Sequence, residues 1–270
     1  MHSSGAAPAL GPIEHSILRA LDRRREPVWR MEYGLPTGGL STTSIRGALQ
    51  RLVATGQVER IERGTYVVMP RSGRVILRPL ELLGSWLGDE PHAVIGQAAA
   101  EHHRLTLDST TTVEVQISRA KSPVEFQGVR YVFSRRDPRS VGQDNVRIRH
   151  AGASTFVASP AKLLVLLLDA TPSRRGTRPP RDLRLALEVV ERGAERRLWE
   201  HVDWPLVLRR HGSAAAARRL GYLLQRAGVD ESDLLPLRGV SGNVALSPLY
   251  PADGPVDPRW RVVINDPVVR

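Results

Sequence analysis

Residues 41–69 read STTSIRGALQRLVATGQVERIERGTYVVM, and this stretch decides the predicted fold of the N-terminal part. From Thr42 to Thr55, apolar residues recur at helical spacing after a Ser/Thr-rich start, and Gly56 is placed to end the helix. Two short strands are expected next, at residues 57–61 and 65–69, joined by a turn at residues 62–64. The stretch therefore predicts a well-capped helix followed directly by a β-hairpin.

The residues before this stretch predict a further helix and a less regular connection. Residues 13–25 carry apolar side chains at helical spacing, and the Glu26-Pro27 pair ends that pattern because a residue before proline disfavours helical geometry. In residues 28–39, Pro36 and the Gly38-Gly39 pair allow one short helix at most. Together these elements predict a winged helix-turn-helix domain over residues 13–70, after a disordered start at 1–12 and before a linker at 71–79.

The remaining residues, 80–270, predict a mixed α/β domain with a helical C-terminal part, so the chain as a whole is assigned to the α+β class. Residues 112–118 alternate strictly between apolar and polar side chains, which is typical of a half-buried strand. The segment after Ser159-Pro160 is apolar all round and is expected at the centre of the core. Helices are expected at 80–87, 94–104, 162–170, 183–191, 199–210 (interrupted by Pro205) and 214–227, and further strands at 129–134, 145–150, 156–157, 243–246 and 260–264.

The composition is that of a folded protein and excludes several classes. Of 270 residues, 41% are hydrophobic and 25% are charged, and the absence of cysteine excludes disulfides and Cys-ligated metals. The longest unbroken apolar run, residues 163–168, is far shorter than the roughly 20 residues that a membrane helix needs. The first residues show no signal-peptide pattern. We therefore expect a cytoplasmic protein with no membrane association.

The formal charge of +11 favours a polyanionic partner, because neutralising phosphates releases condensed counterions. Only Lys121 and Lys162 are lysines, so nearly all of this charge is arginine, which a GC-rich genome would also produce. Residues 1–80 hold 12 arginines against 6 acidic residues. The net charge alone does not distinguish a nucleic-acid partner from an arginine-rich composition without a binding role. The excess of arginine in residues 1–80 favours a nucleic-acid partner.

The predicted helix at 42–55 is the strongest candidate for a DNA-reading element. Its amino end carries hydroxyls suited to phosphate oxygens, and Arg46 and Gln50 lie on the outward face, where they could read guanine and adenine. Arginines of the helix and hairpin are expected to hold the DNA backbone. The predicted DNA-binding residues are Ser41, Thr42, Thr43, Ser44, Arg46, Gln50, Arg51, Arg60, Arg63 and Thr65. A solvated helix face or a protein–protein module remains the alternative.

The sequence lacks the common catalytic motifs, so we expect no enzyme and no cofactor. There is no phosphate-binding glycine loop with lysine, no nucleophile elbow and no zinc-protease helix. The Glu101-His102-His103 run is interpreted as exposed or half-packed polar residues and not as a metal site, because adjacent histidines on a helix point about 100° apart. Gly84-Ser85 lacks the acidic pair of a nucleotidyltransferase. The basic loop at 171–181 could contact DNA or an acidic protein, or it could be an ordinary solvated loop. Arg218-Arg219 could line a partner surface, or their helix could simply pack on the core.

Five segments in order resemble the AbiEi family, the antitoxins of bacterial abortive-infection type IV toxin–antitoxin pairs. The hairpin at 57–66 is similar to that family's opening domain, and residues 95–107, IGQAAAEHHRLTL, are similar to the helix after its linker. Ser159-Pro160-Ala161-Lys162 before a leucine-rich helix resembles another family motif. Residues 217–224, ARRLGYLL, match its late helix, with Gln225 in place of the usual Glu. The segment RWRVVIN at 259–265 resembles its terminal strand.

This resemblance implies an autorepressor that binds repeats in its own operator and whose C-terminal domain counters a cognate nucleotidyltransferase toxin. The partners implied are double-stranded DNA, bound as a monomer or as a dimer on inverted half-sites, and that toxin. Three alternatives stay open: a stand-alone winged-helix regulator without a toxin, a protein-binding module in which the winged domain is a scaffold, and a nuclease that uses the basic loop.

Overall fold

The computed structural model describes residues 10–23, 28–31, 39–68, 78–150, 153–169, 183–239 and 242–269. These residues form a mixed α+β fold with several sheets, which confirms the predicted class. The chain divides into two compact units: a first unit of residues 1–90, 122–131 and 147–155, and a second unit of residues 91–121, 132–146 and 156–270. Most of the predicted disordered start and linker, and the basic loop at 171–181, lie outside the described residues, and the predicted domain boundaries stay a prediction.

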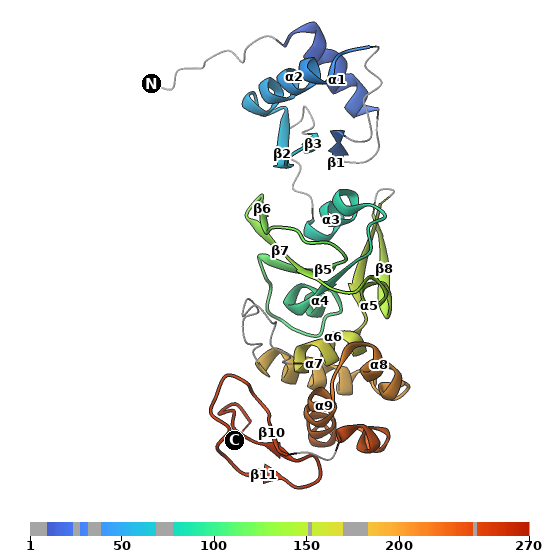
Figure 1. The fold of residues 1–270 in the computed structure, drawn as a ribbon, viewed down its shortest axis with the longest axis vertical. Helices are drawn as coiled ribbons and strands as arrows, with labels where there is room; N and C mark the ends of the chain where they lie inside the picture. Colours follow the sequence, from blue (N-terminus) through green and yellow to red (C-terminus); the bar gives the residue numbers. More distant parts are fainter. Residues whose placement is uncertain are drawn as a thin grey trace. The chain divides into compact units, whose positions relative to one another are not determined.

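The first unit begins with two helices packed on a small sheet (Figure 1). The helices are α1 (Pro12–Asp22) and α2 (Thr42–Ala54). The sheet has the order β1-β3-β2, formed by β1 (Val28–Arg30), β2 (Val58–Glu62) and β3 (Thr65–Val68). The helix and hairpin predicted within residues 42–69 are thereby confirmed as elements.

Strand β1 was not expected, because residues 28–39 were assigned at most one short helix. The strand runs antiparallel to β3, with Val28 opposite Val67 and Arg30 opposite Thr65. Val28 and Trp29 are both only 2% exposed. Three residues are too few to show a strand period, so partner pairing and burial decide the conformation here.

The core of this part is formed by apolar side chains from both helices and the sheet. Leu49 and Leu52 of α2 and Ile17 of α1 are completely buried, and the rings of Trp29 and Tyr66 stack with centroids 5.9 Å apart. Each such aliphatic side chain contributes about 1.5–3 kcal/mol when removed from water. This core fixes which face of α2 points outward.

Helix α3 (Pro79–Leu87) also belongs to the first unit, and Pro79 lies in its first turn. The Trp86 indole donates to the Glu62 carboxylate at 2.7 Å and meets the Tyr131 ring edge to face, with centroids 5.4 Å apart. The hydroxyl of Thr155 donates to the Leu80 carbonyl at 2.5 Å. Helix α3 is thus held to the end of β2 and to neighbouring strands by polar as well as apolar contacts.

Six strands form the largest sheet, in the order β6-β7-β5-β4-β9-β8. Strand β4 runs antiparallel to β5 and parallel to β9. The strands are β4 (His92–Ile95), β5 (Thr112–Ile117), β6 (Val124–Phe126), β7 (Val129–Arg135), β8 (Asn145–His150) and β9 (Ala153–Ala158). Two short helices accompany them, α4 (Gly96–His102) and α5 (Pro138–Gly142).

The helix predicted at 94–104 is wrong at its start. Residues Val94 and Ile95 belong to β4, and α4 begins only at Gly96, whose φ of +67° turns the chain out of the strand. Val94 and Ile95 are almost completely buried between β5 and β9. Two β-branched residues at the start of an apolar run fit strand and helix patterns alike, and the sheet contacts decide between them.

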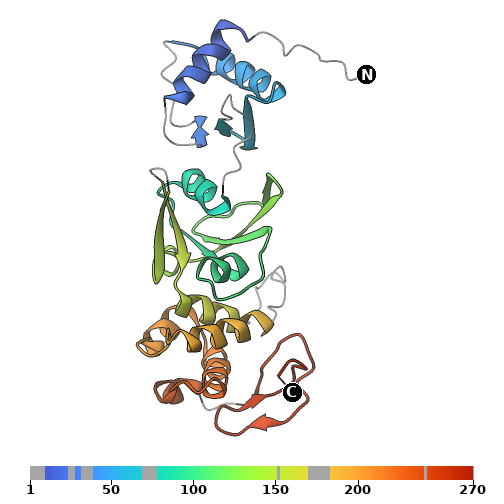
Figure 2. The same ribbon diagram turned by 180° about the vertical axis from the view of Figure 1, so that it is seen from behind.

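The second unit continues with helices (Figure 2). They are α6 (Pro160–Leu168), α7 (Leu183–Glu195), α8 (Trp204–His211), α9 (Ala214–Arg226) and the 3-10 helix η2 (Ser232–Arg238). Helix α6 is buried on every side from Ala161 to Leu168, which confirms its predicted central position. The helix predicted at 199–210 begins only at Trp204, since Pro205 fits the first turn and Asp203 caps it by accepting the Leu206 N–H at 2.9 Å.

The C-terminal strands β10 (Val244–Ala245), β11 (Val256–Asp257) and β12 (Val262–Val263) form a small sheet with β12 in the centre. Two buried arginines of α9 tie this region to the helices. Arg219 donates to the carbonyls of Ala245 at 2.8 Å and Leu168 at 2.9 Å, and Arg218 donates to the Gly242 carbonyl at 2.6 Å. Their exposure of 8% and 3% supports the packed interpretation of this pair over a partner surface.

Lys162 is a completely buried cation at the start of α6. Its Nζ donates to the carbonyls of Ser140, Val141 and Gln143 and to Asn145 Oδ1, at 2.8 to 3.3 Å. Burial lowers the pKa of Lys162 to about 8. Lys162 therefore joins α6 to α5 and to the start of β8 through four oxygen acceptors.

No helix within the described ranges is long and apolar enough to cross a membrane.

Candidate nucleic-acid interface

Helix α2 presents a polar face opposite its buried stripe. Thr43, Arg46 and Gln50 are exposed, whereas Leu49 and Leu52 are completely buried. The exposed residues lie about one turn apart, so their side chains follow one line along the helix. The helix contains two arginines and no acidic residue. This face can therefore approach an anionic surface without carboxylate repulsion.

The amino end of α2 is capped by its own hydroxyls. Ser41 Oγ accepts the N–H of Ser44 at 3.1 Å and lies 2.9 Å from Ser44 Oγ. This cap satisfies one of the first backbone donors and fixes the start of the helix. Thr42 and Thr43 are exposed beside it. Of the four predicted hydroxyl residues, Ser41 and Ser44 thus serve the cap, and Thr42 and Thr43 present their side chains at the surface.

Arg51 is held in place by a buried carboxylate that sequence reasoning missed. Its Nε lies 2.5 Å from Glu14 Oε1 on α1, and the Arg51 side chain remains 61% exposed while that of Glu14 is 7% exposed. A hydrogen bond from the backbone N–H of Glu14 lowers the pKa of Glu14, and the hydrogen bond from Arg51 lowers it further. The sequence could not identify Glu14 as a partner of Arg51, because 37 positions separate the two residues in the chain.

The β2–β3 hairpin is short and exposes two arginines. Arg60 and Arg63 are both exposed, and Arg60 Nε donates to the Glu62 carbonyl at 3.2 Å. The turn relies on Gly64, whose φ is +79°, and the Gly64 carbonyl accepts the Met31 N–H at 2.9 Å. Strand β1 reaches the first residue of β3, where Arg30 lies opposite Thr65.

The two acidic residues of the hairpin take hydrogen bonds from neutral donors. Glu59 accepts from Gln127 Nε2 at 3.1 Å, and Glu62 accepts from the indole of Trp86 at 2.7 Å. These contacts orient both carboxylates toward elements other than α2. Arg60 and Arg63 are exposed on the same hairpin.

Thr65 requires a correction among the predicted contact residues. It is only 4% exposed, in the centre of the sheet between Arg30 and Glu62. A side chain that is buried against neighbouring strands cannot reach a phosphate. We therefore omit Thr65 from the candidate surface and keep the other nine residues.

The Glu101-His102-His103 run is not arranged as a metal site. His103 Nε2 lies 2.7 Å from the Ala158 carbonyl, and burial lowers the pKa of His103. Glu101 accepts the N–H of Thr110 at 3.4 Å. Across the described part of the chain, no group of three or more His, Cys, Asp or Glu residues could hold a metal ion.

No protein-family model matches this sequence, and no curated protein matches it. Among solved structures, the chain is similar to the crystal structure of the RV2827C protein from Mycobacterium tuberculosis. The two share 15% sequence identity with a TM-score of 0.62, and the match covers 96% of this chain and 94% of that one. At this identity the likeness shows a shared fold over nearly the whole of both chains.

Proposed function

We propose that this protein is a sequence-specific DNA-binding repressor whose residues 13–70 form a winged helix-turn-helix with α2 as the recognition helix. The observation that carries the proposal is the acid-free polar face of α2, with Thr43, Arg46 and Gln50 exposed above a fully buried stripe. A helix of this width fits the major groove, where side chains from its first turns reach base edges.

Each residue of this face has a distinct role in the proposed complex. Arg46 forks onto the O6 and N7 acceptors of guanine, and Gln50 pairs with adenine. Thr42 and Thr43 donate to phosphate oxygens beside the positive end of the helix dipole. Arg51, positioned by Glu14, and Arg60 and Arg63 of the hairpin neutralise phosphates and set the register on the duplex.

The resemblance to AbiEi antitoxins extends the proposal to autoregulation and toxin control. The protein would bind repeats upstream of its own operon, and residues 80–270 would counter a cognate nucleotidyltransferase toxin. The second candidate, a stand-alone regulator with the same DNA-binding domain, differs only in lacking that partner.

The deciding experiment is an anisotropy titration of the full chain against its own upstream DNA and a scrambled duplex of equal length, at two salt concentrations. We expect tight binding to the upstream DNA and at least a thousandfold weaker binding to the scrambled duplex. Equal, weak and salt-sensitive binding to both would contradict the repressor proposal and leave only a generic basic surface.

The antitoxin role is tested separately by co-expressing the chain with the nucleotidyltransferase encoded beside it, if one is present. An Arg46→Ala, Gln50→Ala variant is expected to lose repression but still rescue growth, since the proposed toxin control belongs to residues 80–270. Failure of the wild-type chain to rescue growth would favour the stand-alone regulator.

A further inference from the structure

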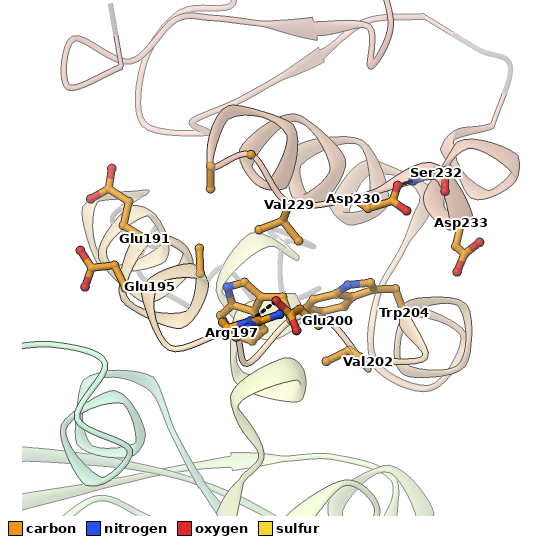
Figure 3. Close-up of a pocket in the computed structure, with 14 residues that line it drawn as sticks. Glu191, Glu195, Arg197, Glu200, Val202, Trp204, Val229, Asp230, Ser232 and Asp233 are labelled. Atoms are coloured by element: carbon orange, nitrogen blue, oxygen red, sulfur yellow. Dashed lines mark hydrogen bonds and ion pairs between the residues drawn. The ribbon is translucent and has the colours of Figure 1, made fainter.

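The second unit contains a cavity of about 770 Å³ that the proposed DNA-binding function does not use (Figure 3). Its walls come from the C-terminal half of α7, the turn that follows it, the first residue of α8, and the connection from α9 to η2. Figure 3 shows Glu191 and Glu195 on one side and Asp230 and Asp233 on the other, above the floor that carries Trp204. All of these residues belong to the second unit.

Two buried indoles line the cavity, and among the described residues only one of them has a hydrogen-bond acceptor. Trp199 and Trp204 are each 3% exposed, and their ring centroids lie 5.6 Å apart. Trp199 Nε1 donates to the Val190 carbonyl at 2.9 Å. Trp204 Nε1 is buried, and no atom of the described structure accepts its hydrogen. Buried indole N–H groups normally have a partner, so this donor indicates a missing acceptor.

The rim of the cavity is strongly acidic in a chain whose formal charge is +11. Five carboxylates surround it, against a single guanidinium: Glu191, Glu195, Glu200, Asp230 and Asp233 against Arg197. Arg197 Nε is already paired with Glu200 Oε1 at 2.5 Å, and this hydrogen bond lowers the pKa of Glu200. The Ser232 N–H lowers the pKa of Asp230. A concave surface with this charge repels phosphates and concentrates cations.

We propose that this cavity binds a basic peptide segment of a partner protein. The arginine or lysine side chains of the segment would pair with the rim carboxylates, and one of its backbone carbonyls would accept the Trp204 Nε1 hydrogen. A peptide supplies both the cation and the acceptor that the cavity requires, whereas a free polyamine supplies only the cation. The inference goes beyond the DNA-binding proposal and is independent of it, because no residue of the α2 face takes part.

The probe for this site is a short acetylated, amidated peptide with two arginines and three glycines, titrated into the full chain at 150 mM salt. The chain contains five tryptophans, so an ¹⁵N spectrum carries five indole N–H signals, and Trp204→Phe identifies one of them. We expect the Trp204 signal to shift and saturate with the arginine peptide. The same peptide with citrulline in place of arginine is neutral and should leave that signal in place.

Two variants separate the site from general charge effects. Glu191→Gln with Glu195→Gln should weaken peptide binding on the order of tenfold, as expected for two exposed ion pairs. The matched control, Asp89→Asn with Glu125→Gln, removes two exposed carboxylates outside the cavity and should leave the affinity unchanged. Trp204→Phe keeps an aromatic ring, although a smaller one, removes the indole N–H donor and should weaken binding severalfold.

The proposal fails if the Trp204 signal does not shift, if the citrulline peptide binds equally well, or if both double variants lose affinity alike. Spermidine that binds as tightly as the peptide would instead assign the cavity to free amines and overturn the peptide proposal. None of these results depends on DNA binding, so they leave the repressor proposal to its own test.

Discussion

In the proposed DNA complex, Arg46 is the residue on which base recognition by α2 is expected to depend most. Arg46→Ala should weaken binding to the preferred operator by about 1–3 kcal/mol and relax the preference at one base pair, because a bidentate guanine contact is lost. Arg209→Ala, which removes the same charge from an exposed position of α8, is the control and should leave specificity intact. Competition titrations against single-base operator variants measure both effects. Unchanged specificity in Arg46→Ala would mean that another element reads the bases.

We expect the first unit to lose stability at acid pH because of Glu14. Its pKa is lowered in the folded chain, so the unfolded chain binds the proton more readily as the pH falls. The stability that this group contributes is therefore present above its pKa in the unfolded chain and is lost as the pH falls through its lowered pKa in the folded chain. Denaturant unfolding at pH 6 and pH 4 should show this loss in the wild type, and Glu14→Gln should lack this part of the pH dependence. An identical pH profile for both proteins would show that the Arg51 pair does not contribute.

Lys162 is expected to be the most sensitive cation in the second unit. Lys162→Met removes the donor for three carbonyls and the Asn145 side chain, and should lower the free energy of unfolding by about 2–4 kcal/mol. Lys121→Met is the matched control. Lys121 is half-buried and its Nζ lies 5.4 Å from the centroid of the Phe133 ring, so its replacement should cost less than about 1 kcal/mol. Urea unfolding of both variants measures the difference. Equal costs would rule out the oxygen cage as the cause.

At the scale of elements, the close contact of α7 with the following turn depends on Gly193. A Cβ at this position would lie 2.0 Å from the Trp199 ring. Gly193→Ala should therefore destabilise the second unit by about 1–3 kcal/mol. Gly47→Ala in α2 is the opposite case, since its Cβ would meet only the end of Arg51 at 3.6 Å, and helix propensity should stabilise α2 by about 0.5–1 kcal/mol. Thermal unfolding measures the change in stability of both variants, which should have opposite signs. Unchanged stability of Gly193→Ala would show that the Trp199 ring can move aside.

The hairpin and α2 are expected to differ in what they contribute to DNA binding. Arg63 lies in the β2–β3 turn, so Arg63→Ala should weaken binding to all sequences alike and reduce the slope of log K against log salt by about 0.9. Titrations at four salt concentrations, against operator and scrambled DNA, measure that slope. A sequence-dependent loss would instead place the turn in a groove.

For the whole molecule, the charge distribution separates two kinds of surface. The first unit carries the acid-free face of α2, while the second unit carries a cavity with five carboxylates, within one chain of net charge +11. Screening limits the reach of a charge to about 8–10 Å at physiological salt, so a partner responds mainly to the charges of the surface that it contacts. The positive net charge of the chain gives no indication of the acidic cavity.

Elements with a strong local period could be predicted from the sequence. Five elements match their predicted positions to within about two residues: helix α2, the hairpin, strand β5, the buried helix α6 and helix α9. The predicted mixed α+β class is also confirmed. In α2, β5 and α9 the side chains repeat at the helical or strand period over a full element, whereas α6 was predicted from its Ser-Pro start and the hairpin from its turn residues. In each case neighbouring residues suffice to specify the element. The outward positions of Arg46 and Gln50 follow from the same periodicity.

Contacts between residues that are distant in the chain were decided only by the tertiary structure. Strand β1 and the start of β4 exist because of strand partners, and Glu14 and Arg51 meet although 37 residues separate them. The burial of Thr65 and the oxygen cage around Lys162 depend in the same way on neighbours contributed by other elements. The same holds for the Trp204 N–H, which has no acceptor among the described residues. Sequence spacing cannot encode these contacts because hydrogen bonding and burial are set by proximity in space.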